Sequence, residues 1–160
     1  MPKGLKPPAF GTYQVELLSP ELAVIAYPVV AAAYPTVAVE QWRGYAGSVA
    51  AAPPEQSGLL GLCSDSGYYC GLLVYRNDRG PWHEPRLSVE LFVALDMIDP
   101  RTAINALIAA AEARAAALSC LTVQVCTDRD SDMASRIRKA GYRPVRALMT
   151  KEIPAMTKIN

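Results

Sequence analysis

The sequence has few of the residues that build metal centres. Its 160 residues include one histidine and four cysteines, at positions 63, 70, 120 and 126, and no two cysteines have the C-x-x-C spacing. A structural zinc site needs four such ligands close together, so we expect no metal. If Ser66-Gly67 forms a two-residue hairpin turn, Cys63 and Cys70 face each other and a disulfide is possible. Two reduced thiols packed as small apolar groups are the alternative that we favour.

The chain also lacks an excess of charge of either sign. Lys and Arg total 16, Asp and Glu total 15, and the net charge is +1. Proteins that bind nucleic acid attract phosphates through a strong positive field, so this balance argues against a nucleic-acid partner. Its basic cluster is better explained as cations near a helix C-terminus, facing solvent. The cluster consists of Arg136, Arg138, Lys139, Arg143 and Arg146.

Only one apolar run is long enough to suggest a membrane. Residues 22–39 carry no charge, and this run just reaches the roughly 18 residues that a spanning helix needs. Pro28 and Pro35 interrupt it, and acidic Glu21 and Glu40 flank it without a basic residue. We therefore expect buried, proline-broken helices and no membrane partner. Because the first eight residues contain no apolar signal segment, we also expect a cytoplasmic protein.

Length and apolar content predict one domain with its own core. Apolar residues make up 51% of the 160 positions, and a chain of this size buries about 70% of its unfolded surface. We expect a single domain over residues 1–160, in which residues 1–10 form a flexible lead.

Periodicity predicts an α+β domain built on one mixed sheet. Strands are expected at 13–18, 59–63, 68–75, 87–95, 121–127 and 142–153, and helices at 20–35, 36–51, 100–118 and 131–140. The first helix is broken at its prolines, Thr36 is expected to cap the second, and Gly141 suits the end of the last. The helix between strands 87–95 and 121–127 implies that these two strands are parallel. The order is β-α-α-β-β-β-α-β-α-β.

This order, together with four short segments, resembles the GNAT acetyltransferases. The segments are Leu91-Phe92-Val93, Ala110–Arg114, Leu121–Val125 and Ile137–Val145. The likeness covers most of the chain as topology and residues 87–152 as sequence. It implies a layered α/β/α fold and an N-acyltransferase that uses acetyl-CoA or another acyl-CoA. It further implies that the acceptor is the amine of a small molecule or a peptide, and it leaves open whether the chain forms a homodimer.

The resemblance also implies where acyl-CoA binds. In the family, the pantetheine arm pairs with strand backbone, here at Phe92, Val93 and Ala94. The pyrophosphate binds the N–H groups that open the next helix, where free donors and the positive helix end stabilise an anion. The corresponding residues here are Arg101, Thr102, Ala103, Ile104, Asn105 and Ala106. Asp130 or Ser131 stands where the family often has an asparagine.

The helix start departs from the family pattern. The expected glycine position holds Ile104, and a glycine is what lets a phosphate approach the backbone closely. Asp99 precedes Pro100 and is a good N-cap, so its carboxylate would compete with pyrophosphate for the same N–H groups. Asp96 adds negative charge. Arg101 offsets this by pairing with a phosphate, and Thr102 and Asn105 can donate side-chain hydrogen bonds.

Two residues are candidates for the chemistry. Glu90 interrupts an apolar strand, and some GNAT enzymes use a glutamate on this strand as general base; we expect burial to raise its pKa. The alternative is a surface glutamate that pairs with Arg86 or lies in water. The position from which a tyrosine protonates the departing thiolate in many members holds Ile137. Tyr142 is the nearest candidate, with packing in the core as its alternative.

Further residues carry weaker signals. His83 lies in a Trp-His-Glu loop and is more simply a solvated side chain. Tyr27, Tyr34, Trp42 and Tyr45 lie on the front helices and could line an acceptor pocket, although packing in the core is the explanation that we favour. Since the loop glycine and the tyrosine are missing, a GNAT-shaped binding or assembly module without catalysis remains the rival hypothesis.

Overall fold

The computed structural model describes residues 9–10, 13–96, 99–128 and 131–155. Their strands are β1 (Ala9–Phe10), β2 (Tyr13–Leu17), β3 (Ser57–Cys63), β4 (Tyr69–Asp78), β5 (Arg86–Ala94) and β6 (Thr122–Val125). Their helices are α1 (Pro20–Ile25), α2 (Tyr27–Ala33), α3 (Val39–Ala51), α4 (Pro100–Ala117) and α5 (Asp132–Lys139).

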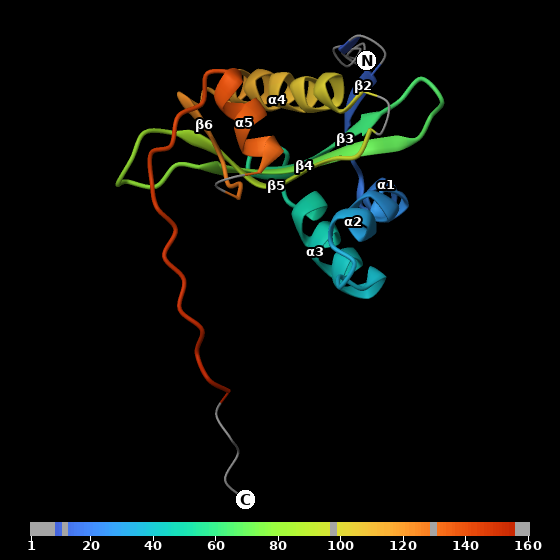
Figure 1. Cartoon of the computed structure of the whole chain (residues 1–160), viewed down its shortest axis with the longest axis horizontal. Coiled ribbons are helices and arrows are strands. Elements are labelled where there is room, and N and C mark those ends of the chain that lie inside the picture. The colour runs from blue at the N-terminus through green and yellow to red at the C-terminus, as the bar shows by residue number, and fades with distance from the viewer. Residues whose placement is uncertain (1–8, 11–12, 97–98, 129–130, 156–160) are drawn as a thin grey trace, which may run out of the picture.

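The strands form one mixed sheet whose spatial order follows the chain, from β1 to β6. All neighbours are antiparallel except β5 and β6, which are parallel and joined through α4. Helices α4 and α5 cover one face, and α1, α2 and α3 lie on the other (Figure 1). The expected α+β class, the mixed sheet and its parallel pair are therefore confirmed.

Each face of the sheet carries its own apolar core. Under α4, Leu107 and Leu87 are fully buried and pack with Leu62 and Leu73 of the central strands. On the other face, Trp42 of α3 packs with α1 and α2 residues, and its Nε1 donates to the Ala23 carbonyl at 2.7 Å. Because both faces are covered, β3 is buried nearly throughout and the middle of β4, residues 71–75, is buried as well.

The β3–β4 hairpin follows its turn chemistry. Gly67 has φ +82°, a conformation that glycine adopts without strain. The pairing shifts between Leu62 and Cys63, so Cys63 lies opposite Tyr69 and not opposite Cys70. All four cysteines are free thiols, as in the favoured alternative.

Several local expectations differ from the structure. Ala9 and Phe10, assigned to the flexible lead, pair with β2. The third helix is capped at Ala38, where Gln41 reaches back to the backbone N–H, and not at Thr36. The run 22–39 contributes to three separate short helices, and among the described residues no helix is long and apolar enough to cross a membrane.

The expected last strand is absent from the structure. After α5 and Gly141, which has φ +99°, the chain leaves the body of the protein as an extended tail (Figure 1). Residues 143–155, called the tail below, are exposed throughout and form no strand. The strand prediction was wrong because alternation describes a segment that suits a sheet, whereas a strand also needs an edge to pair with.

Candidate functional site

A β-bulge interrupts the pairing of β4 and β5 at Glu90. On one side of it Val89 lies opposite Tyr75, on the other side Leu91 lies opposite Val74, and Glu90 has no partner on β4. An extra residue of this kind bends a strand and redirects its side chain, and bulges are common next to active sites. The glutamate that interrupts the apolar run is therefore also an interruption of the backbone pairing.

The same point ends the pairing between β5 and β6. Their register runs from Arg86 opposite Thr122 to Val89 opposite Val125, and no further pair follows within the described residues. Beyond the bulge, β5 continues to Ala94 with β4 on one side only. Phe92, Val93 and Ala94 thus lie on a strand edge that β6 does not cover, which is where an extended chain with amide groups can pair.

The Glu90 carboxylate is held by two side chains from other elements. Arg76 Nε on β4 donates to Oε1 at 2.8 Å, and the Tyr45 hydroxyl on α3 donates to Oε2 at 3.1 Å. The hydrogen bond from Arg76 lowers the pKa of Glu90 and outweighs partial burial, which acts in the opposite direction. The expectation that burial raises this pKa is wrong, because the side chain remains about one-third exposed and has a cationic partner.

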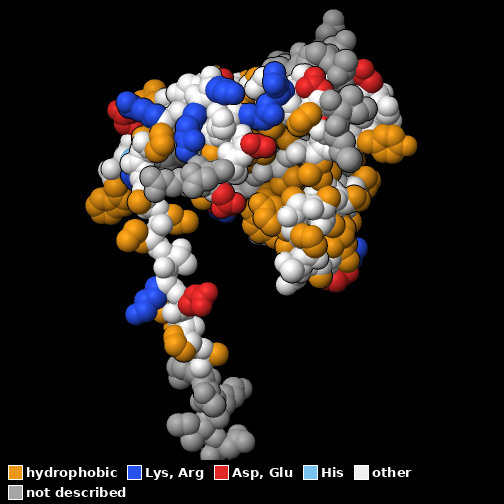
Figure 2. Space-filling model, viewed as in Figure 1, with side chains coloured by type: hydrophobic (Ala, Val, Ile, Leu, Met, Phe, Trp, Pro, Cys, Tyr) orange, Lys and Arg blue, Asp and Glu red, His pale blue; other side chains and the backbone are white. Residues whose placement is uncertain are grey.

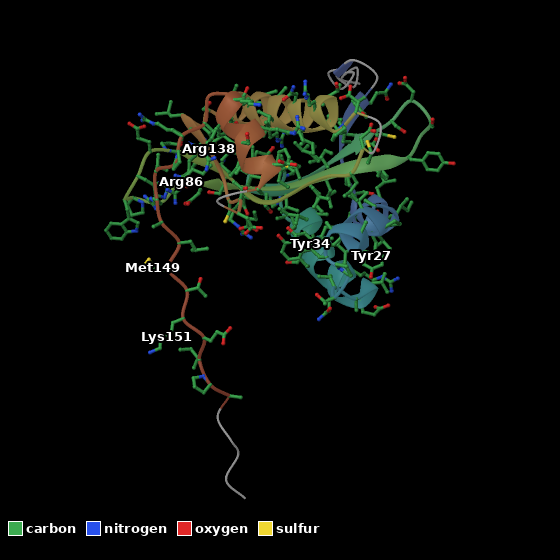
Figure 3. All side chains as sticks on the ribbon, in the orientation of Figure 1. Tyr27, Tyr34, Arg86, Arg138, Met149 and Lys151 are labelled. Atoms are coloured by element: carbon green, nitrogen blue, oxygen red, sulfur yellow. The ribbon has the colours of Figure 1, made fainter. Side chains whose placement is uncertain are left out.

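Glu90 faces a hollow of about 490 Å³ between α2, α3 and β5. Its lining is mostly apolar and aromatic: Val30, Tyr34, Val37, Gln41, Trp42, Tyr45 and Leu91 accompany the carboxylate. Of the four aromatic candidates, Tyr34 and Tyr45 are exposed and line the hollow. Trp42 is a core residue with one face on the hollow, and the Tyr27 hydroxyl is bonded to the Val37 carbonyl at 2.7 Å. Figure 3 shows Tyr34 on this side of the sheet.

The N-terminus of α4 is capped by its own aspartate, as the sequence predicts. Asp99 accepts from the Thr102 N–H at 3.1 Å and from the Thr102 hydroxyl. These hydrogen bonds lower the pKa of Asp99, so the carboxylate is charged at neutral pH. Asp96 accepts from the Asp99 N–H at 2.9 Å and holds a second carboxylate near the helix start. An anion that binds at this end of α4 must either displace these carboxylates or bind against their electrostatic repulsion.

The predicted phosphate residues divide into exposed and buried groups. Arg101 and Asn105 are exposed on the first turns of α4, and Thr102 is half-buried. Ala103, Ile104 and Ala106 are buried in the core, so their side chains are closed to a ligand. Ser131 caps α5, where its hydroxyl accepts from the Ala134 N–H at 3.1 Å and donates to the Asp128 carbonyl at 3.0 Å.

Solved structures share the fold of this chain. No family model matches the chain, and no curated protein is significantly similar to it in sequence. An aminoglycoside N-acetyltransferase in complex with CoA superposes with a TM-score of 0.73 over 91% of this chain and 97% of the other, at 12% identity. The glucosamine-6-phosphate N-acetyltransferase from Arabidopsis thaliana gives 0.66 over 90% and 100%, at 8% identity. The chain has the GNAT fold. The ribosomal-protein-alanine N-acetyltransferase from Brucella melitensis gives 0.63 over 91% and 99%, at 14% identity.

Within this GNAT fold, Tyr142 lies apart from the hollow. Its ring packs against the cluster of Ile104, Ile108 and Ile137 on the α4 and α5 side of the sheet. Its hydroxyl donates to Glu112 Oε1 at 3.1 Å, and burial together with the Glu112 charge raises its pKa. The structure therefore brings Glu90 together with Tyr45 and Arg76, but it does not bring Glu90 together with Tyr142.

His83 also belongs to a different cluster. Its Nε2 lies 3.3 Å from Asp78 Oδ1, and Arg86 Nη2 contacts the other Asp78 oxygen at 2.9 Å. This network ties the β4–β5 loop together. Arg86, which was expected to pair with Glu90, therefore pairs with Asp78 instead. The actual partner, Arg76, was not singled out in the sequence, because the pairing depends on the register between β4 and β5.

Proposed function

We propose that the chain transfers an acyl group from an acyl-CoA to a primary amine by direct attack. The observation that carries this proposal is the bulge at Glu90. It combines, at one point of the sheet, an uncovered strand edge, a carboxylate and an aromatic hollow. The three features match the needs of a transfer reaction: a groove for the donor, a proton acceptor and a pocket for the acceptor.

The donor would lie along the free edge of β5. In this proposal the backbone groups of Phe92, Val93 and Ala94 pair with the amides of the pantetheine arm, a role that requires no glycine. The N-terminus of α4 fits a pyrophosphate only in part, because Asp99 already accepts from Thr102. Arg101 is exposed on the first turn and would supply the compensating positive charge.

The acceptor would enter through the hollow. Tyr34, Trp42 and Leu91 favour an amine attached to an apolar or aromatic body, while the negative charge of Glu90 attracts the ammonium form. The neighbouring structures include enzymes named for an aminoglycoside, a sugar phosphate and a ribosomal-protein alanine, so the fold accommodates acceptors of different sizes. Both a small molecule and a peptide remain consistent with this hollow.

In the reaction, the ammonium form first releases one proton to solvent, the neutral amine nitrogen then bonds to the thioester carbon, and the carbon–sulfur bond breaks. Glu90 accepts the proton that the nitrogen loses, and a backbone N–H on the strand near Phe92 to Ala94 stabilises the oxyanion. The thiolate then takes a proton from solvent, since the Tyr142 hydroxyl is bonded to Glu112. Because the Glu90 pKa is lowered, the carboxylate is ionised at neutral pH, and the acidic limb of activity should reflect this low pKa.

Ligand-dependent melting and thiol release test the proposal together. Acetyl-CoA at about 100 times its dissociation constant stabilises a fold by about 2.7 kcal/mol, which is about 5–10 °C for a chain of this size. A panel of amines should then release free CoA thiol. Glu90→Gln should lower turnover while the melting shift remains, and Glu84→Gln in the exposed β4–β5 loop should match the wild type. Equal turnover in the two variants would remove Glu90 as the base.

A GNAT-shaped binding module is the second candidate. The capped start of α4 and the buried side chains of Ala103, Ile104 and Ala106 favour it, because both reduce the room for pyrophosphate. This alternative predicts no melting shift with acetyl-CoA or with longer acyl-CoAs at millimolar concentration. That result would refute the acyltransferase proposal.

A further inference from the structure

The hollow beside Glu90 carries one ionised side chain. Glu90 is the single charged residue in its lining, and within the part of the chain that the structure describes no Lys, Arg or His side chain joins it there. The cation that contacts Glu90, Arg76, is bound through its Nε to Oε1 at 2.8 Å and does not line the hollow. The α2 side is neutral as well, because residues 22–39 carry no charge. A ligand with an anionic group would therefore lose hydration here without gaining a cationic partner.

The polar side chains of the lining are already bonded to the protein. Gln41 Oε1 accepts from the Ala38 N–H at 2.8 Å, and the Tyr45 hydroxyl donates to Glu90 Oε2 at 3.1 Å. The rest of the lining is aliphatic or aromatic. A ligand body with many hydroxyl groups, such as a sugar, would leave most of them without a side-chain partner, and each lost hydrogen bond lowers the affinity.

An aromatic wall lies next to the carboxylate. The Trp42 and Tyr45 rings have their centroids 5.9 Å apart and are tilted by 46°. Trp42 is held by its buried position and by the hydrogen bond from its Nε1 to the Ala23 carbonyl. Tyr45 belongs to both parts of the site, since its ring lies beside Trp42 and its hydroxyl holds Glu90. Burial and the Glu90 charge raise the pKa of Tyr45 to about 12, so the hydroxyl stays protonated and continues to donate.

An ammonium group joined to a flat ring suits the carboxylate and the wall together. The ammonium can pair with Glu90 and contact the faces of the neighbouring tyrosine rings, which attract cations. A ring joined to it by a short alkyl chain would then lie against Tyr34 and Leu91, which extend the wall. Tyr34 is 46% exposed, so a ligand can reach the wall from solvent without rearranging the core.

We propose that the acceptor is an arylalkyl monoamine: a primary amine on a short alkyl chain that carries an aromatic ring and no anionic group. The acylation of this amine rests on the proposed function, whereas its binding in the hollow does not. Amino acids fall outside the class because of their carboxylate, and amino sugars because of their hydroxyl groups. A carboxylate about 5 Å from Glu90 is repelled enough in water to lower the affinity about fourfold, and more where water is excluded.

Three amines with the same ring isolate the effect of charge. They are 2-phenylethylamine, phenylalaninol, which adds a neutral hydroxymethyl group beside the amine, and phenylalanine, which has a carboxylate at that place. With acetyl-CoA as donor, thiol release should give similar kcat/KM for the first two. The value for phenylalanine should be lower by at least about fourfold at low ionic strength. Glucosamine should also be poor, since it has no ring and many hydroxyl groups.

Tyr34→Ala tests the aromatic wall. It should lower kcat/KM for 2-phenylethylamine about two- to tenfold, the range expected for one lost aromatic contact, and it should leave the value for ethylamine, which has no ring, unchanged. Tyr68→Ala is the matched control, because Tyr68 is an exposed tyrosine of the β3–β4 turn that does not line the hollow. This control should match the wild type with both amines.

An NMR titration measures binding independently of catalysis. The chain has two tryptophans, so its ¹H–¹⁵N spectrum contains two indole N–H signals. Adding 2-phenylethylamine should shift the signal of Trp42, while Trp82, which is 89% exposed in the β4–β5 loop, is the internal control. Phenylalanine should bind more weakly. Glu90→Gln should weaken the binding of 2-phenylethylamine about two- to fivefold, because the ammonium loses its ionic partner.

The outcomes separate this inference from the proposed function. A selective shift of Trp42 without thiol release would support the amine site and refute acyl transfer. Thiol release with phenylalanine or glucosamine at a kcat/KM equal to or above that of 2-phenylethylamine would overturn the arylalkylamine class and leave acyl transfer intact. An equal loss with 2-phenylethylamine and ethylamine in Tyr34→Ala would contradict the role of Tyr34 in holding the ring. If no amine shifts Trp42 and none is acylated, both proposals fail.

Discussion

Replacing Asp99 by asparagine tests whether the Asp99 carboxylate weakens the binding of an anion at the N-terminus of α4. Asparagine retains an acceptor for the Thr102 N–H, which Asp99 holds at 3.1 Å, so the cap geometry should persist. The negative charge is lost, and with it a favourable interaction with the helix dipole. The free energy of unfolding should fall slightly, while the affinity for acyl-CoA should rise.

The gain in affinity follows from Coulomb's law. A phosphate bound to the neighbouring N–H groups would lie about 5 Å from the Asp99 carboxylate, where each pair of unit charges repels by about 0.8 kcal/mol in water. Two phosphate charges give about 1.7 kcal/mol, and salt at physiological strength screens this to about half. Asp99→Asn should therefore bind CoA about fourfold more tightly at that ionic strength and about tenfold more tightly at 0.01 M.

Isothermal titration calorimetry of CoA binding at the two salt concentrations measures both predicted ratios of affinity between Asp99→Asn and the wild type. The matched control is Asp65→Asn, which removes one exposed carboxylate in the β3–β4 turn and should leave the affinity unchanged. Equal or weaker binding in Asp99→Asn at both salt concentrations would refute the competition between aspartate and phosphate. A gain that does not shrink as salt rises would show that the effect is not electrostatic.

Three further outcomes follow from the packing and the ion pair. Leu107→Ala, at a fully buried position between α4 and the sheet, should cost about 2–5 kcal/mol in urea denaturation. Gly71→Ala should cost about 1–3 kcal/mol, because the added Cβ would lie 3.0 Å from Leu107 and 3.1 Å from the Val93 carbonyl, and the backbone cannot withdraw easily. Glu90→Gln should lose about 0.2–1 kcal/mol at pH 7, since the pair with Arg76 is largely solvent-screened. Because the folded-state pKa of Glu90 is lowered, the contribution of the pair is present above the ordinary pKa near 4.5 and disappears as the pH falls through the lower value. Wild type and Glu90→Gln should therefore converge in urea denaturation as the pH falls below the ordinary glutamate range.

Local chemistry made parts of this structure predictable. Asp99 next to Pro100 gave the start of α4, because a cap depends only on the residues around it. The strands around the Gly67 turn and the parallel pair joined by α4 also follow from short-range patterns. The surface also differs between the two faces of the sheet. Figure 2 shows Lys and Arg side chains gathered over α4 and α5, and hydrophobic side chains over α1 to α3.

What the sequence could not supply is the pairing between distant segments. Glu90 stood out as a charge in an apolar strand, but only the register with β4 shows that it is an extra residue. Its partners, Arg76 and Tyr45, come from another strand and a helix, and without them the direction of the pKa shift was wrong. Likewise, alternation in the tail described a strand without saying whose edge it would join.

The bulge has a consequence for how this site could be lost. If Glu90 were deleted, Val89 would be followed directly by Leu91, and the two sides of the strand would alternate without interruption. Leu87, Val89, Phe92 and Ala94 would still face α4, and Leu91 and Val93 would still face α1 to α3, as they do now. The core thus has no need of this residue. Loss of a single codon would remove the carboxylate and the bulge while leaving every apolar side chain on its present side. One deletion would therefore abolish the candidate site and keep the sheet intact.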